Sequence, residues 1–114
     1  MIRTLKLMLS ACVFISLLFQ PLLAGDIEEG KKLGFDRKKG NCLACHAVDG
    51  GSLAGTTGPM LIAMKARFPD RDTLIAQISD PRKNNPQTIM PPFGSHDILS
   101  EGEINKIVTW LYSL

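Results

Sequence analysis

Two cysteines three positions apart, followed directly by a histidine, constrain this chain of 114 residues more than any other feature. The segment is Cys42-Leu43-Ala44-Cys45-His46, and this spacing is typical of covalent attachment of a c-type haem. One helical turn with a two-residue gap brings both thiols to one edge of a porphyrin, where they can add to its two vinyl groups. The imidazole of His46 then falls below the iron as the proximal axial ligand. We therefore expect one haem c, covalently attached through Cys42 and Cys45.

Two other uses of the cysteine pair are less well supported. A thioredoxin-type redox pair follows a strand in a βαβ unit, and no alternating β-branched run precedes Asn41. A structural zinc site needs four ligands. Outside the motif the chain offers only Cys12 and His96, so a closed tetrahedral site is poorly supplied.

The first 24 residues have the layout of a secretory signal peptide. Arg3 and Lys6 precede an apolar run over residues 7–19, and Gln20-Pro21 breaks that run. Because the run is too short to span a bilayer comfortably, we expect cleavage after residue 24 and no retained membrane anchor. The chain is then exported to the periplasm as a monohaem cytochrome c domain of residues 25–114.

Cys12 follows Leu9-Ser10-Ala11, which resembles a bacterial lipid-attachment box. Cleavage there would leave residues 13–19 as an exposed apolar tail. We therefore interpret Cys12 as a small apolar residue of the signal helix.

Charge gives no support for nucleic-acid binding once the signal peptide is removed. The whole chain carries a net charge of +2, and losing Arg3 and Lys6 leaves 11 of its 13 basic residues, equal to its 11 acidic ones. The basic side chains that remain gather just before the haem motif, where they could steer an acidic partner. The two remaining cysteines are consumed by haem attachment, so we expect no catalytic residue in this chain.

Helical periodicity predicts an all-α domain of about four to five helices wrapped round the haem. We expect helices over residues 27–35 with Asp26 as N-cap, 60–67, and 71–79 with Asp70 as N-cap. Ser100 and Glu103 form a capping box for a terminal helix whose apolar stripe runs to the end of the chain. Residues 82–94 hold three prolines and form an extended loop.

The second axial position of the iron has four candidates in the mature chain. Met60 and Met64 follow the histidine closely, in a predicted helix on the proximal side, where methionine more often fills a core. Met90 lies beside Pro91-Pro92 in a loop that can cross to the opposite face, so we favour it over the alternative, His96. A backbone carbonyl should fix the imidazole of His46, and Pro59 is a good candidate to supply it.

These features resemble the class I cytochrome c family: a first helix with Gly30 and Phe35, the haem motif, Gly58-Pro59, a methionine-bearing loop and a terminal helix. That resemblance implies close crossing of the first and last helices, and a Pro59 carbonyl bonded to His46. Residues 67–71 and the loop of residues 85–94 are similar to SoxX, the family of small monohaem subunits of bacterial SoxAX complexes.

The SoxX resemblance implies a heterodimer with SoxA, which supplies the active-site cysteine and its own haem. The complex joins thiosulfate to a cysteine of the SoxYZ carrier, as an L-cysteine S-thiosulfotransferase, and passes electrons to a downstream cytochrome acceptor. This chain would be an enzyme only as a subunit of that complex. Two alternatives are a free-standing periplasmic electron carrier, and a haem enzyme or sensor whose sixth ligand is displaceable.

Overall fold

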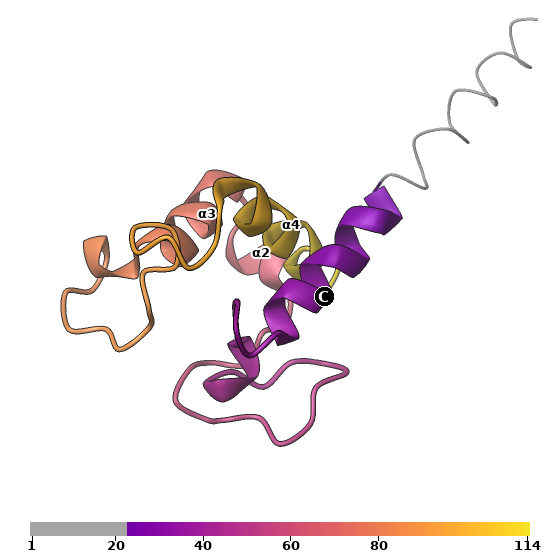
Figure 1. Cartoon of the computed structure of the whole chain (residues 1–114), viewed down its shortest axis with the longest axis horizontal. Helices are drawn as coiled ribbons and strands as arrows, with labels where there is room; N and C mark the ends of the chain where they lie inside the picture. The colour runs from indigo at the N-terminus through magenta and orange to yellow at the C-terminus, as the bar shows by residue number, and fades with distance from the viewer. Residues whose placement is uncertain (1–22) are drawn as a thin grey trace, which may run out of the picture.

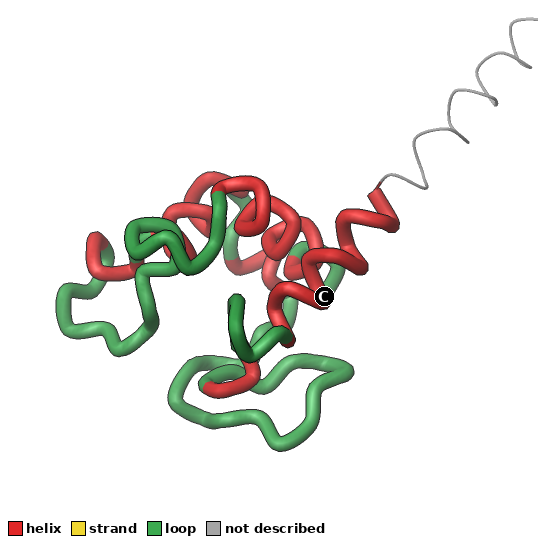
Figure 2. The backbone as a smooth tube through the Cα atoms, viewed as in Figure 1, coloured by secondary structure: helices red, strands yellow, loops and turns green. Residues whose placement is uncertain are grey.

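The computed structural model describes residues 23–114, in which helices are connected by long loops (Figures 1 and 2). Its α-helices cover residues 23–35, α2 (Met64–Arg67), α3 (Arg71–Ser79) and α4 (Glu101–Leu111), with 3-10 turns at η1 (Cys42–Ala44) and η2 (Pro81–Lys83). Residues 23–114 contain no strand, only an isolated bridge between Val48 and Leu61. The predicted all-α fold is confirmed. The predicted signal peptide lies outside the described residues, apart from its last two.

The first helix and α4 cross with almost no space between them. A Cβ atom on Gly30 would collide with the Lys106 backbone and would lie 2.9 Å from Cβ of Trp110. One on Gly34 would collide with the Trp110 ring, which packs edge-on against Phe35 at 5.4 Å between centroids. The two glycines therefore permit the close crossing, and the aromatic pair of Phe35 and Trp110 packs beside Gly34. Trp110 is a core residue, only 2% exposed.

Helix α3 begins as the sequence predicts and packs on α4. The Asp70 carboxylate accepts a hydrogen bond from the Asp72 amide at 3.0 Å, which caps the first turn. Arg71 then joins the two helices, because its Nη2 donates to the Asn105 carbonyl at 2.7 Å and to Thr109 Oγ1 at 2.9 Å. The capping box of α4 is also confirmed, with Ser100 and Glu103 satisfying each other's backbone amides.

Two predicted helix starts are wrong. Residues 23–25 are already helical, so Asp26 lies inside the first helix and is not its N-cap. Helix α2 begins at Met64, four residues later than expected, because Ala63 takes a left-handed conformation (φ 51°) and Leu61 pairs with Val48.

The core follows from these crossings. Its buried apolar side chains come from α3, from α4 and from the loops on either side of them, and none of the polar or charged side chains of residues 23–114 is buried. No helix in this part of the chain combines the length and the apolar character needed to cross a bilayer.

Candidate functional site

The Cys42–His46 segment is folded as a single tight turn that follows a left-handed residue. Asn41 has φ 47°, and the amides of Cys45 and His46 both donate to the Cys42 carbonyl, at 3.2 and 2.9 Å. The amide of Gly40 bonds the Leu33 carbonyl at 3.0 Å, which holds the turn against the end of the first helix. The predicted single helical turn is thus a 3-10 turn, and it brings both cysteines and the histidine to one cavity.

The imidazole of His46 is held on one edge by a backbone carbonyl. Its Nδ1 lies 2.6 Å from the carbonyl oxygen of Pro59, the contact that the sequence predicts. A carbonyl only accepts hydrogen bonds, so Nδ1 carries the proton and Nε2 keeps its lone pair for a metal. The ring rests on Gly58, where a Cβ atom would lie only 2.7 Å from Nε2. Gly58 itself is fixed by a 2.7 Å bond from its amide to the Cys45 carbonyl.

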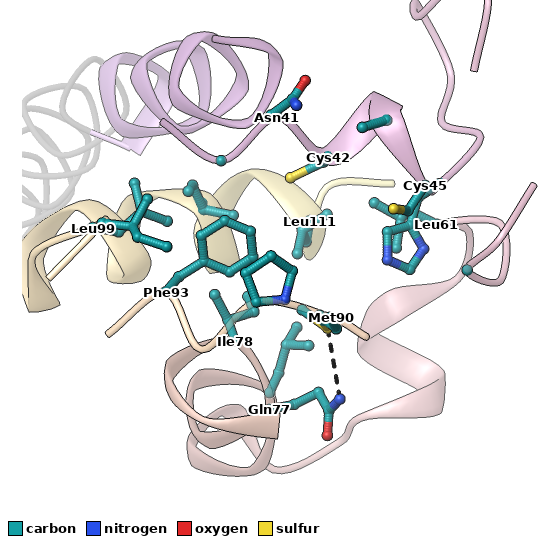
Figure 3. Close-up of a pocket in the computed structure, with 18 of the residues that line it drawn as sticks. Asn41, Cys42, Cys45, Leu61, Gln77, Ile78, Met90, Phe93, Leu99 and Leu111 are labelled. Atoms are coloured by element: carbon teal, nitrogen blue, oxygen red, sulfur yellow. Dashed lines mark hydrogen bonds between the residues drawn. The ribbon is translucent and has the colours of Figure 1, made fainter. Parts of the chain in front are cut away.

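A cavity of about 530 Å³ opens beside this turn, a volume typical of a cofactor site. Figure 3 shows Cys42 and Cys45 along its upper side, with Ile78, Met90 and Phe93 across from them. Much of its wall is apolar, from the inner faces of α3 and α4 and the loop between them: Leu74, Ile78, Phe93, Leu99, Ile107 and Leu111. Such a lining excludes water and lowers the local dielectric.

Both cysteines of the motif are free thiols in this structure. Burial raises the pKa of the Cys42 thiol to about 11, so at neutral pH it is protonated. A redox pair of the thioredoxin type needs the opposite, a lowered thiol pKa. Within residues 23–114, no group of three or more His, Cys, Asp or Glu side chains is arranged to hold a metal ion.

The four candidates for the second axial ligand differ in whether they line the cavity. Met60 is 56% exposed, His96 is exposed beside Arg82, and neither lines the cavity. Met64 and Met90 both line it.

The sulfur of Met64 contacts the side chain of Arg67. It accepts a hydrogen bond from Arg67 Nη1 at 3.5 Å, and the same nitrogen donates to the carbonyls of Met60 at 2.9 Å and Ile62 at 3.3 Å. These carbonyls closely follow the proline carbonyl that contacts the imidazole. Met64 therefore lies on the imidazole side of the cavity.

Met90 reaches the cavity from the loop that follows α3. Its amide donates to Thr88 Oγ1 at 3.1 Å, and its sulfur accepts a hydrogen bond from Gln77 Nε2 at 3.8 Å, the dashed line in Figure 3. The loop is tied back to α3 by backbone bonds from Phe93 to Ile78 at 3.2 Å and from Gly94 to the Ser79 carbonyl at 3.0 Å. The sequence analysis did not identify Gln77 as a residue of the site. Its position as a polar residue between Leu74 and Ile78 on one helix face could have indicated this role.

The rim of the cavity beside Cys42 is basic. Arg37, Lys38 and Lys39 line it. Lys39 is neutralised by Glu103 at 2.9 Å, and this ammonium together with the Ser100 amide holds the pKa of the Glu103 carboxyl below its ordinary value. Arg37 and Lys38 form no ion pair with any residue of the described part. The rim therefore presents positive charge to anionic groups.

An all-α fold that brings two thiols, an imidazole with a free Nε2 and a thioether to one apolar cavity defines the class of c-type cytochromes. The family described as "Cytochrome C oxidase, cbb3-type, subunit III" matches residues 26–111, and the chain belongs to this family. An uncharacterized lipoprotein of Aquifex aeolicus (strain VF5) is 38% identical over 84 residues, which are 73% of this chain and 40% of the relative. The chain thus spans less than half the length of that relative.

Membership of this family implies a covalently bound haem c and a role in electron transfer. The residues present fit that group, because the thiols, the imidazole and the thioether line one cavity with a largely apolar wall. When bound, haem c supplies an iron that gains and loses one electron. The protein's own part is to hold the imidazole tautomer through Pro59, to exclude water with the apolar wall, and to present a basic rim.

Proposed function

We propose that this protein binds a single haem c between His46 and Met90, attached through Cys42 and Cys45, and transfers electrons in the periplasm. The observation that carries the proposal is that all four side chains line one cavity, while Met60 and His96 do not. A thioether ligand raises the reduction potential, and a closed sixth position denies access to oxygen or peroxide.

Spectroscopy of the purified holoprotein tests this assignment. We expect one haem per chain by mass, the thioether-to-iron band in the oxidised protein, and no carbon monoxide binding by the reduced protein. Carbon monoxide binding without that band would instead favour the haem enzyme or sensor with a displaceable sixth ligand.

We further propose that the electron-transfer partner is SoxA, in a SoxAX complex that couples thiosulfate to the SoxYZ carrier. Support comes from the similarity of residues 67–71 and 85–94 to SoxX, and from the fact that haem attachment leaves the mature chain no thiol for sulfur chemistry. The exposed basic residues Arg37 and Lys38 give the cavity rim the charge to attract an acidic surface. The chain would pass electrons from the complex to a downstream cytochrome.

Purification under mild conditions from the native cells tests the partner. Copurification with a larger haem protein that turns over thiosulfate is the expected result. Purification as a lone, active monohaem protein would favour the second candidate, a free-standing carrier.

The proposal includes export, which the printed name of the lipoprotein relative supports. Cleavage after residue 24 gives a mature chain that begins at Gly25, whereas lipid attachment at Cys12 would keep residues 12–24. The intact mass of the mature protein distinguishes the two, because the second form is heavier by thirteen residues and the attached lipid.

A further inference from the structure

The loop of residues 48–62, which follows the haem-attachment turn, exposes apolar side chains and carries almost no charge. It contains no Lys or Arg, and Asp49 is its single acidic residue. Five large apolar side chains are exposed within residues 23–114, and three of them lie on this loop: Leu53, Met60 and Ile62. Exposed apolar side chains that gather in one region are typical of a contact surface. We call residues 48–62 the apolar loop.

The apolar loop has a fixed shape. Val48 pairs with Leu61 at its base, where the Leu61 amide donates to the carbonyl of Ala47 at 2.8 Å. The Gly55 amide donates to the Leu43 carbonyl at 2.8 Å, which holds the middle of the loop against the haem-attachment turn. Figure 1 shows this loop apart from α3 and α4. Because the loop is already ordered, a partner that binds it pays little of the cost of fixing its conformation.

Met60 and Ile62 share the outer side of an extended segment. Leu61 between them is buried, and side chains alternate in direction along an extended backbone. The carbonyls of Met60 and Ile62 both accept hydrogen bonds from Arg67 Nη1, at 2.9 and 3.3 Å. These backbone acceptors are therefore occupied, so a partner meets the two side chains and does not add a strand to this segment.

Leu53 gains nothing from the fold of the free chain. Its side chain is fully exposed, and its backbone is left-handed, with φ 55°. This conformation is strained for leucine and unstrained for glycine. A strained residue whose side chain contacts no core is better explained by a contact with another molecule.

The charge of the apolar loop indicates which kind of molecule covers it. Binding to an anionic lipid surface combines apolar side chains with basic ones, and this loop has no basic residue. Permanent protein interfaces are more apolar than transient ones. The exposed Arg37 and Lys38 on the cavity rim suit the other kind of contact, a transient one that salt weakens.

We propose that the apolar loop binds the permanent partner subunit through an uncharged apolar surface of that partner, and that the basic rim stays free for an acidic downstream carrier. This rests on the proposed function, in which the permanent partner is SoxA. Leu53, Met60 and Ile62 are the side chains that the partner covers. The chain then holds both proteins at once, at two surfaces of different chemistry.

The main variants are Leu53→Gly and Ile62→Ser, each as holoprotein. Association with purified SoxA is measured by calorimetry at low and at high salt, about 0.05 and 0.5 M NaCl. We expect each variant to bind about tenfold more weakly at both salt concentrations, because apolar contacts are lost and no ion pair is involved. Leu53→Gly relieves the backbone strain, so its thermal midpoint should not fall. Its weaker binding is then separated from any loss of fold, even if Ile62→Ser does not fold.

Two controls lie outside the apolar loop. Ile89 is also exposed, so Ile89→Ser makes the same kind of change elsewhere and should leave the affinity for SoxA unchanged. The double variant Arg37→Gln, Lys38→Gln removes charge from the basic rim and should also keep this affinity.

Failure of this inference differs from failure of the proposed function. If Leu53→Gly and Ile62→Ser bind SoxA as tightly as Ile89→Ser does, or if only the rim double variant binds weakly, the apolar loop is not the partner surface and the inference is overturned, while the complex stands. A wild-type protein that binds no SoxA overturns the proposed complex and this inference with it. Sedimentation of the wild type alone as a dimer that Leu53→Gly dissociates assigns the loop to a second copy of this chain, which also overturns the inference.

Discussion

The imidazole wall of the cavity (residues 41–62) and the thioether wall (residues 77–95) differ in how many side chains take part in their hydrogen bonds. Backbone hydrogen bonds tie the imidazole wall to itself, from the amides of residues 55, 58 and 61 to the carbonyls of residues 43, 45 and 47, at 2.7 to 2.8 Å. The thioether wall also has backbone bonds, such as those from Phe93 to Ile78 and from Gly94 to Ser79, but side chains add many more bonds to it. Asp80 accepts bonds there from Arg82 and Ser95, and Gln77 donates to Met90.

This difference determines how strongly substitutions and pH can affect each wall. Backbone bonds do not change with pH and survive most substitutions, so the imidazole wall is a fixed frame. Side-chain bonds depend on residue identity and on protonation, so substitutions in the thioether wall can alter the iron ligand without unfolding the domain. The predictions below test this division, beginning with the largest expected effect.

His46→Ala removes the ligand on which the imidazole wall is built. We expect no protein with covalently attached haem, because the iron loses its proximal ligand beside the two thiols. Haem staining of the purified chain measures this directly. His96→Ala is the control, since His96 lies outside the cavity, and it should retain full haem content. A coloured His46→Ala protein at wild-type yield contradicts the assignment.

Met90→Ala should leave the haem attached and open the sixth position. We expect the potential to fall by on the order of 0.1 V and the reduced protein to bind carbon monoxide. The exposed Met60 provides the control, as Met60→Ala should change neither property. An unchanged potential in Met90→Ala would transfer the ligand role to Met64, Met60 or His96.

Gly58→Ala tests whether the imidazole wall is as rigid as its backbone bonds indicate. The added methyl group meets the His46 ring and has no room, because the Gly58 amide is bonded to Cys45. Overpacking of this kind destabilises by about 2 kcal/mol, measured by denaturant unfolding of the holoprotein. At Gly102 on α4 a Cβ atom would meet only Ser100 Oγ, at 4.0 Å, so Gly102→Ala should stabilise the fold by about 1 kcal/mol. An equal change in the free energy of unfolding for Gly58→Ala and Gly102→Ala would show that the imidazole wall adjusts to the added methyl group.

The sequence predicted the imidazole wall better than the thioether wall, because the first depends on short-range spacing. Cys42, Cys45 and His46 lie within one turn, and Pro59 is thirteen residues away in a glycine-rich loop with few possible paths. The helices with capping side chains were equally accessible, since a cap is a local pattern. Asp70 and the Ser100 box both confirm this.

The features that the sequence did not predict depend on contacts between segments that are far apart in the chain. The late start of α2 follows from the pairing of Leu61 with Val48, which no local propensity reports. The contact of Gln77 with Met90 requires the path of the whole intervening loop, including the turn at Pro81–Lys83. The sequence shows Gln77 as a polar residue in the apolar stripe of α3, but it does not show that Met90 is its partner.

The smallest expected effect concerns Asp80, whose carboxylate joins the end of α3 to the loop that carries Met90. Hydrogen bonds from the Arg82 side chain, and then from Ser95, hold the pKa of the Asp80 carboxyl well below its ordinary value of 3.8. A lowered pKa means that these bonds stabilise the folded chain fully above that value, and that their contribution is lost as the pH falls through the lower folded value.

Asp80→Asn should therefore lower the thermal midpoint of the holoprotein by a small, constant amount between pH 5 and 7, and the difference from wild type should shrink below about pH 4. The thioether-to-iron band, followed over the same pH range, should weaken earlier in the variant, because the bonds that fix the start of the thioether wall are lost. Asp49→Asn is the control: this exposed side chain forms no hydrogen bond within residues 23–114, and it lies in the imidazole wall. If both variants lose the band at the same pH, the carboxylate does not hold the thioether wall, and backbone bonds such as Gly94 to Ser79 hold it instead.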